Sequence, residues 1–193
     1  MTAHIRPGLA LALFEPDIAQ NAGTMLRMCA CLGLDAFLIG PAGFAAGDRH
    51  LRRAGMDYLD RVNLARPASF AEFESWRASQ PQRRRLVLLT TKAPSSYLDC
   101  HYAPGDILMV GRESAGVPPE VSARVDAAVA IPMQPGMRSL NVAVAAAIVV
   151  GEALRQLQAK TMRSLTDDRP WITLRLGGPI AENVIDSKSA ERA

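Results

Sequence analysis

Short apolar runs recur along the chain up to about residue 160, and each ends in a polar or glycine-containing turn. Runs of this length are typical of strands that are buried on both faces of a parallel sheet. Helix-like patterns lie between several of them. This alternation predicts an α/β fold in which a parallel sheet carries helices on both faces. The predicted strands are residues 9–14, 36–39, 62–65, 86–89, 107–110 and 127–131.

Four helices are predicted between these strands. Apolar residues at i, i+3, i+4 and i+7 from Met25 to Leu32 predict a helix that ends at Gly33, and the polar residues 20–24 before it predict a turn. Ser69 and Glu72 form a capping box, which predicts a helix over residues 70–78. Two shorter helices are expected over residues 48–60 and 119–124.

The most apolar predicted helix covers residues 142–156. Its apolar side chains point in nearly every direction, and such a helix is normally buried, by its own sheet, by a partner subunit or by both. The apolar part has about a dozen residues and is too short to span a bilayer, which needs about 20. A polar loop over residues 134–141 precedes this helix, and its backbone amides and the Ser139 and Asn141 side chains are expected to face a ligand.

Composition and charge exclude few functions. The net charge of +3 and the pI of about 9.0 permit nucleic acid as a partner without requiring it. The three cysteines form no CxxC pair and favour a reduced, cytoplasmic setting, and the three scattered histidines predict no metal site. No secretory signal or membrane span is predicted. The pattern weakens beyond residue 160, so we expect a domain over 1–160 and a partly disordered appendage over 161–193.

Three of the later predicted strands end in polar loops of small residues, at 90–92, 111–116 and 134–141. Ligands of open parallel sheets bind outside the carboxyl ends of the strands, so these loops are expected to form one pocket. Gly111 and Gly116 would let the backbone approach a ligand closely. The loops lack the glycine fingerprint of dinucleotide-binding folds and the P-loop pattern. A Rossmann-type oxidoreductase is therefore disfavoured.

Three groups of residues stand in order along the chain: Asn21-x-Gly23-x-x-x-Arg27, then Gly111-Arg112-Glu113-x-x-Gly116-Val117-Pro118, and then Ile131-Pro132-Met133 with Ser139-Leu140-Asn141. They resemble the three motifs of the SPOUT (TrmH-like) RNA 2′-O-methyltransferases, over about residues 9–158. Residues 51–60 and 131–141 are most similar to small dimeric members of this family, which methylate the wobble ribose of certain leucine tRNAs.

The resemblance implies a SPOUT-type α/β fold with a C-terminal trefoil knot, a homodimer formed in part by the helix over 142–156, and S-adenosylmethionine as the cofactor. It implies tRNA as the partner, through the anticodon stem-loop, and no metal. The residues that it places at the cofactor are Leu89, Thr90, Gly111, Ile131, Met133, Ser139 and Leu140. Those that it places at the acceptor ribose are Asn21, Glu113, Asn141 and Arg27, the last from the partner subunit. The residues expected to contact RNA are Arg49, Arg52, Arg53 and Arg138.

The implied reaction transfers a methyl group from a sulfonium to a ribose hydroxyl, so the enzyme must position the groups, exclude water and remove a proton. The motif arginine is often assigned as the base in this family. A guanidinium, with a pKa above about 12, is a poor base. We therefore expect Arg27 to hold the acceptor phosphate and to stabilise the developing alkoxide. The proton would leave to a phosphate oxygen, to Glu113 or to water.

Each of these residues also has an ordinary structural interpretation. Arg27 and the arginines of residues 49–53 could be solvated, Asn21 and Ser139 could be helix caps or turn residues, and Glu113 could pair with Arg112 or Arg138. Two other functions remain alternatives. One is 2′-O-methylation of another tRNA position or of rRNA, and the other is RNA binding without catalysis.

Overall fold

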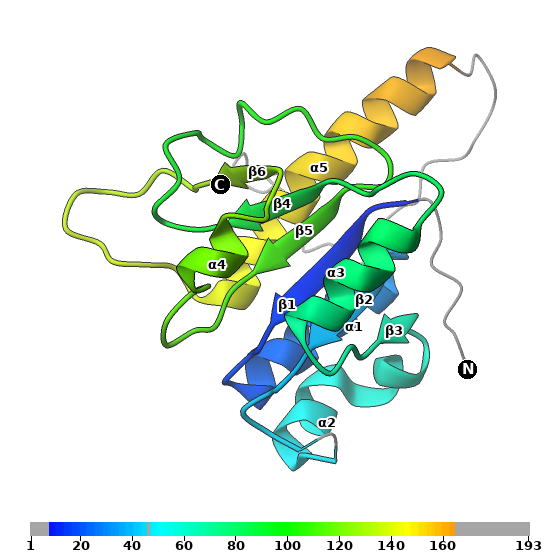
Figure 1. Cartoon of the computed structure of the whole chain (residues 1–193), viewed down its shortest axis with the longest axis vertical. Helices are drawn as coiled ribbons and strands as arrows, with labels where there is room; N and C mark the ends of the chain where they lie inside the picture. The colour runs from blue at the N-terminus through cyan, green and yellow to red at the C-terminus, as the bar shows by residue number, and fades with distance from the viewer. Residues whose placement is uncertain (1–7, 46, 165–193) are drawn as a thin grey trace, which may run out of the picture.

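The computed structural model describes residues 8–45 and 47–164, and a six-stranded parallel sheet lies at the centre of this part of the chain (Figure 1). The strand order is β3-β2-β1-β5-β4-β6, so β5 lies between β1 and β4. The predicted α/β class and parallel sheet are confirmed. The strands are β1 (Ala10–Phe14), β2 (Asp35–Ile39), β3 (Leu64–Ala65), β4 (Leu86–Leu89), β5 (Ile107–Val110) and β6 (Ala127–Val129).

Helices cover both faces of the sheet. Successive side chains of a strand point to opposite faces, and the central strands β1 and β2 are buried throughout, so both faces need a cover. Leu11 and Leu13 of β1 belong to one buried cluster, and Ala12 and Phe14 belong to another. The first cluster includes residues of α1 and α5, and the second includes residues of α3 and α4. The helices are α1 (Ala19–Leu32), α2 (Arg49–Gly55), the 3-10 helix η1 (Met56–Asp60), α3 (Phe70–Ser79), α4 (Pro119–Ser122) and α5 (Val142–Ser164).

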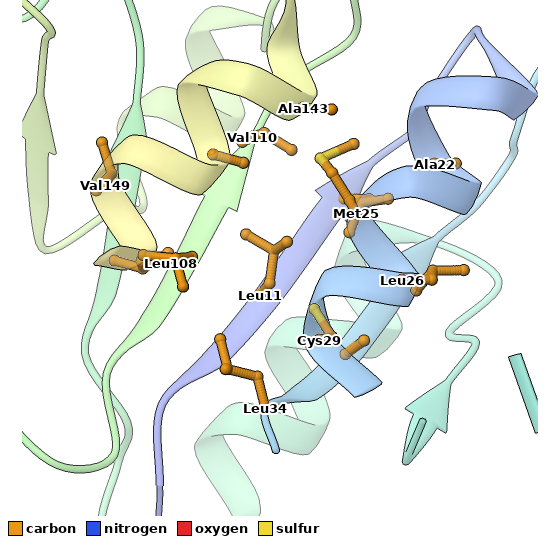
Figure 2. Packing of buried hydrophobic residues seen from close by; sticks show 14 of the residues in the cluster. Leu11, Ala22, Met25, Leu26, Cys29, Leu34, Leu108, Val110, Ala143 and Val149 are labelled. Atoms are coloured by element: carbon orange, nitrogen blue, oxygen red, sulfur yellow. The ribbon is translucent and has the colours of Figure 1, made fainter. Parts of the chain in front are cut away.

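Helices α1 and α5 pack side by side on the first face. Met25 and Cys29 of α1 and Val149 of α5 belong to the same buried cluster as Leu11 and Leu108 of the neighbouring strands, and Figure 2 shows these residues. Burial raises the pKa of the Cys29 thiol to about 12, so this cysteine is an apolar packing residue and not a nucleophile. This core fixes the two helices whose first turns meet at the carboxyl edge of the sheet.

A buried arginine makes contacts at the amino ends of the strands, opposite the carboxyl ends. Arg77 of α3 is 0% exposed and donates hydrogen bonds to Glu74 and to Asp126, which lies just before β6. Burial alone would lower the pKa of this guanidinium, but the hydrogen bonds to the two carboxylates raise it above its usual value. The interaction joins α3 to the amino end of β6. This end of the sheet is therefore held together by structural contacts.

The predicted turn over residues 20–24 is wrong, because these residues are helical and α1 begins at Ala19. The polar Asn21 side chain makes tertiary hydrogen bonds, and Gly23 is buried against α2. The single helix predicted over 48–60 is instead divided at Met56, whose φ of 52° is incompatible with an α-helix. The strand predicted to end at Ile131 ends at Val129.

Helix α5 is not buried on all sides within one chain. Its inner side chains pack on the sheet, but Val144 is 50% exposed and Ile148 is 36% exposed. With Ala147 and Gly151 they form an exposed stripe of small and apolar residues, which we call the α5 stripe. Helix α5 continues to Ser164, and the remainder of the predicted appendage lies outside the described residues. No helix in the described part of the chain has the length and apolarity needed to cross a membrane.

Candidate active site

A pocket of about 430 Å³ lies at the carboxyl ends of β4, β5 and β6. Loops at residues 90–91, 111–116 and 131–141 contribute to its wall, together with the first turns of α1 and α5. The three strand-end loops predicted to meet therefore do meet. The pocket volume falls within the range of roughly 300–1,000 Å³ that is typical of small-molecule sites.

All seven residues predicted to contact a cofactor line this pocket. Three of the four residues predicted at the acceptor ribose, namely Asn21, Glu113 and Asn141, line it as well. The walls are apolar on one side, where Leu88, Val110 and Ile131 lie, and polar where Asn21 and Glu113 lie. Residues to which the sequence reasoning assigned no role in binding or catalysis also line the pocket: Ile18, Leu88, Thr91, Val110, Arg112, Val117, Val142 and Ala145. Most are strand ends or motif neighbours, and their position follows from the loops beside them.

A chain of side-chain hydrogen bonds joins the three polar residues of the pocket. Asn21 Nδ2 donates to Glu113 Oε1 at 2.9 Å, and Asn141 Nδ2 donates to Asn21 Oδ1 at 3.0 Å. Asn141 Oδ1 accepts from the backbone N–H of Ala143 at 2.9 Å and so caps α5. The other Glu113 oxygen accepts from the backbone N–H of Asp17 at 2.9 Å. Both carboxylate oxygens of Glu113 are thus engaged, which favours a positioning role for this residue over a role as proton acceptor.

The alternative pairing of Glu113 with Arg112 does not occur. Arg112 instead lies 3.3 Å from Glu15 and 3.2 Å from Asp17, which follow β1. The side chain of Ser114 also donates to Asp17, and this contact, the N–H of Ser114 and the charge of Arg112 together lower the pKa of the Asp17 carboxyl. These contacts fasten the loop after β5 to the loop after β1, so the polar side of the pocket is fixed from two strands.

The loop after β5 is closed by a tight backbone contact. Arg112 and Gly116 exchange two backbone hydrogen bonds of 2.9 Å, and Gly116 has a φ of 69°. A Cβ atom on Gly111 would lie 2.6 Å from the carbonyl carbon of Gly116. Glycine is therefore required at position 111, and the backbone there faces the pocket without an obstructing side chain.

Substitution of Gly111 by alanine is expected to weaken small-molecule binding in this pocket by about tenfold or more and to lower the Tm, because overpacking against backbone costs about 1–3 kcal/mol. Calorimetric titration with S-adenosylmethionine and thermal unfolding measure both effects. The matched control is Gly47→Ala, because a Cβ on Gly47 would meet nothing within 4 Å. Equal affinities for the two variants would contradict this account of the loop.

Arg27 does not line the pocket of its own chain. Its side chain is exposed, its Nη1 donates to Met56 Sδ at 3.0 Å, and its Cζ lies 5.2 Å from the centre of the Tyr58 ring. The structure therefore separates Arg27 from Asn21, although both lie on α1. Neither Met56 nor Tyr58 was singled out from the sequence, and no local pattern distinguishes them as partners of an arginine.

The four arginines predicted to bind RNA are exposed, and none of them lines the pocket. Arg49, Arg52 and Arg53 lie on α2, whose first turn is capped by the Asp48 carboxylate. Arg138 lies in the loop between β6 and α5. Among the described residues, no group of three or more His, Cys, Asp or Glu side chains is arranged to hold a metal ion.

Comparisons with known proteins identify similar sequences. Residues 8–151 match the model of the SpoU rRNA Methylase family. A tRNA (cytidine(34)-2′-O)-methyltransferase from Beijerinckia indica subsp. indica is 62% identical over 149 residues, which are 77% of this chain and 92% of that protein.

Solved structures agree with the sequence matches. A structure that concerns the 2-OH methylation of C/U34 on tRNA superposes with a TM-score of 0.73 at 39% identity and covers 80% of this chain and 99% of that one. The SpoU methyltransferase AviRb from Streptomyces viridochromogenes, in complex with the cofactor AdoMet, superposes with a TM-score of 0.76 at 25% identity. That match covers 81% of this chain and 61% of AviRb.

Proposed function

The chain belongs to the SpoU methylase family of RNA methyltransferases, and on this basis we propose that it transfers a methyl group from S-adenosylmethionine to the ribose 2′-hydroxyl of nucleotide 34 in tRNA. Leucine isoacceptors, with cytidine or uridine at that position, are the expected substrates. The relative from Beijerinckia indica is named for this reaction at cytidine 34, and the chain spans nearly all of that protein.

The observation that carries the proposal is the meeting of three strand-end loops in one pocket. The pocket fits S-adenosylmethionine in its chemistry. Leu89, Ile131 and Leu140 give apolar walls for an adenine ring, and the bare backbone at Gly111 leaves room for a close-fitting ligand. AviRb, which has the same fold, has been crystallised with this cofactor.

The residues of the pocket have separate tasks in this reaction. When bound, S-adenosylmethionine supplies a methyl group that is already activated by its sulfonium. Asn21, Glu113 and Asn141 form the polar side of the pocket, where they orient the acceptor ribose through amide and carboxylate groups that are held in place by one another. Arg27 binds the acceptor phosphate and stabilises negative charge on the attacking oxygen. The proton passes to a phosphate oxygen or to water.

The proposal includes a homodimer in which Arg27 acts on the pocket of the partner subunit. Two observations support it. Arg27 lies outside the pocket of its own chain, and helix α5, whose first turn lines the pocket, exposes Val144 and Ile148 on the α5 stripe. A second copy of the chain placed on this face would bury the stripe.

The proposal also includes the trefoil knot of the SPOUT fold. In its support, the backbone at Ser95 and Tyr97, in the connection between β4 and β5, bonds to Ala130 at 2.9 Å. The chain runs on from there into the loop over residues 131–141. The two connections thus lie against each other at the place where such a crossing would occur. An experimental structure that traces both connections tests this part.

Recognition of the anticodon stem-loop is assigned to exposed arginines. Arg49, Arg52 and Arg53 give α2 a positive face, and Arg138 lies in a loop of the pocket wall. Contacts of this kind bind phosphate groups without reading sequence and make affinity depend on salt. They position the tRNA, and the pocket itself selects the nucleotide.

The function is tested by incubating the purified protein with labelled S-adenosylmethionine and unmodified leucine tRNA, followed by mapping of the methylated nucleotide. A single 2′-O-methyl group at position 34 is expected. Matched tRNAs with a 2′-deoxy nucleotide at that position should accept none. Methylation at another tRNA position or in rRNA would overturn the assignment of the substrate and retain the reaction. Binding of RNA with no transfer would leave the non-catalytic alternative.

A further inference from the structure

The 3-10 helix η1 makes direct contact with the arginine that we assign to the reaction. The Tyr58 ring lies 5.2 Å from Arg27 Cζ and 5.9 Å from Arg61 Cζ, and Met56 Sδ accepts a hydrogen bond from Arg27. A guanidinium within about 6 Å of an aromatic ring is attracted by the negative charge of the ring face. Two guanidinium groups therefore share one aromatic side chain at this place.

Two glycines bring η1 to Arg27. A Cβ on Gly23 of α1 would lie 2.6 Å from the Leu51 carbonyl oxygen and 2.8 Å from Ala54 Cβ, so α1 and α2 touch through their backbones. A Cβ on Gly55 would overlap the Leu59 side chain, so the end of α2 packs closely against η1. In the motif Asn21-x-Gly23-x-x-x-Arg27, Gly23 lets α2 pack closely against α1. This packing brings η1, which follows α2, into contact with Arg27 one turn later on α1.

Met56 adds a strained backbone at the same place. Its φ of 52° and ψ of −144° belong to a region that residues with a side chain rarely adopt. The turn is therefore imposed by the packing on both sides of it, and it places Met56 Sδ and the Tyr58 ring against one guanidinium. Tyr58 belongs to neither of the two buried apolar clusters, whereas its neighbour Leu59 packs against the first. The Tyr58 ring is thus not required for core packing.

We propose that Tyr58 is a positioning residue for methyl transfer, which holds the guanidinium plane of Arg27 in the orientation that meets the acceptor. This inference rests on the proposed function of Arg27. A free arginine side chain samples many rotamers, and the ring limits them before RNA arrives. The effect is expected in the catalytic step, because orientation of a charge-stabilising group matters most where charge develops.

The test compares Tyr58→Leu, which removes the ring, with Tyr58→Phe, which keeps it. Tyr58→Leu is expected to lower kcat about fivefold, with the KM for S-adenosylmethionine and the Tm unchanged, as loss of one exposed cation–π contact predicts. Tyr58→Phe should restore the kcat of the original protein. Arg61→Ala is the matched control, because it removes the second guanidinium from the same ring and leaves Arg27 in contact with it.

A second readout does not depend on activity. In the NMR spectrum of the full-length protein with labelled arginine, the δ protons of Arg27 should lose their ring-current shift in Tyr58→Leu and keep it in Tyr58→Phe. A fivefold loss of kcat by Tyr58→Leu in the Arg27→Ala background as well would show that the ring acts independently of Arg27 and would overturn the inference. So would an unchanged kcat in Tyr58→Leu, or a loss of activity matched by a fall in Tm in both Tyr58→Leu and Tyr58→Gln.

These outcomes are distinct from failure of the proposed function. If the original protein methylates no tRNA, the proposed function fails and the catalytic role of Tyr58 fails with it, whatever the NMR spectrum shows. If the original protein is active and the Arg27 protons keep their shift without the Tyr58 ring, the inference alone fails.

Discussion

Replacement of Arg27 by alanine is expected to reduce the rate of methyl transfer by about 10²–10³-fold, which is the effect of removing one group that stabilises developing charge on oxygen. Affinity for S-adenosylmethionine should be unchanged, because Arg27 is assigned to the acceptor phosphate and the residues assigned to the cofactor remain in place. Single-turnover transfer to tRNA and calorimetric titration with the cofactor measure the two quantities. Arg27→Lys keeps the charge but loses the planar fork, so it should recover only part of the rate.

The control for charge is Arg124→Ala. Arg124 is exposed and lies just before β6, at the edge of the sheet opposite the pocket, so its removal should leave the rate near that of the original protein. A rate for Arg27→Ala within tenfold of the original would contradict the assigned role.

Mixed dimers test whether Arg27 acts across the interface. Neither Arg27→Ala nor Gly111→Val is expected to be active alone. If Arg27 serves the partner, a mixed dimer has one complete site, with the pocket from the first subunit and the arginine from the second. The isolated mixed dimer should retain up to about half of the activity of the original dimer, and an equilibrated mixture, of which about half is mixed dimer, up to about a quarter. An inactive mixture would place Arg27 and the pocket in the same subunit.

A double substitution on the α5 stripe, Val144→Asp with Ile148→Asp, is expected to separate the dimer and to abolish activity. Burial of one Val or Ile contributes about 1.5–3 kcal/mol, so the loss of two weakens association by at least 10²–10⁴-fold, and buried charge adds to this. Light scattering coupled to size exclusion measures the mass, and the transfer assay measures activity.

Leu98→Asp is the control, since Leu98 is 57% exposed and lies in the connection between β4 and β5, outside the α5 stripe. It changes an exposed apolar residue to the same acid. A double variant that stays dimeric, or a monomer with full activity, would contradict the proposed arrangement.

Four of the six strands could be predicted to within one residue of their bounds, whereas β3 and β6 are each two residues shorter than predicted. Leu86–Leu89 and Ile107–Val110 match their predicted bounds because strands covered on both faces are apolar throughout and stop at polar turns. The pocket could also be predicted, since the carboxyl ends of parallel strands share one edge. The order of the strands could not be predicted, because β4 and β5 are both apolar. Their composition does not indicate that β5 lies between β1 and β4.

Errors arose where local preference and tertiary contact disagree. Asn21 and Gly23 are typical of turns, yet both are helical, because the first bonds across the pocket and the second admits α2. Met56 is a good helix former and nevertheless ends α2. The contact between Arg27 and Tyr58 joins residues that are 31 positions apart in the sequence. It depends on the end of α2 at Met56, which was not predicted, so no sequence pattern indicates it.

The hydrogen bonds that join Asn21, Glu113 and Asn141 constrain how this protein is able to evolve. Each side chain satisfies a donor or an acceptor of another, so a change at one of them leaves a polar group of its partner without this hydrogen bond. Drift at these three positions is therefore expected to be concerted: lineages should keep all three or exchange them together, even though the positions lie 92 and 120 residues apart along the chain.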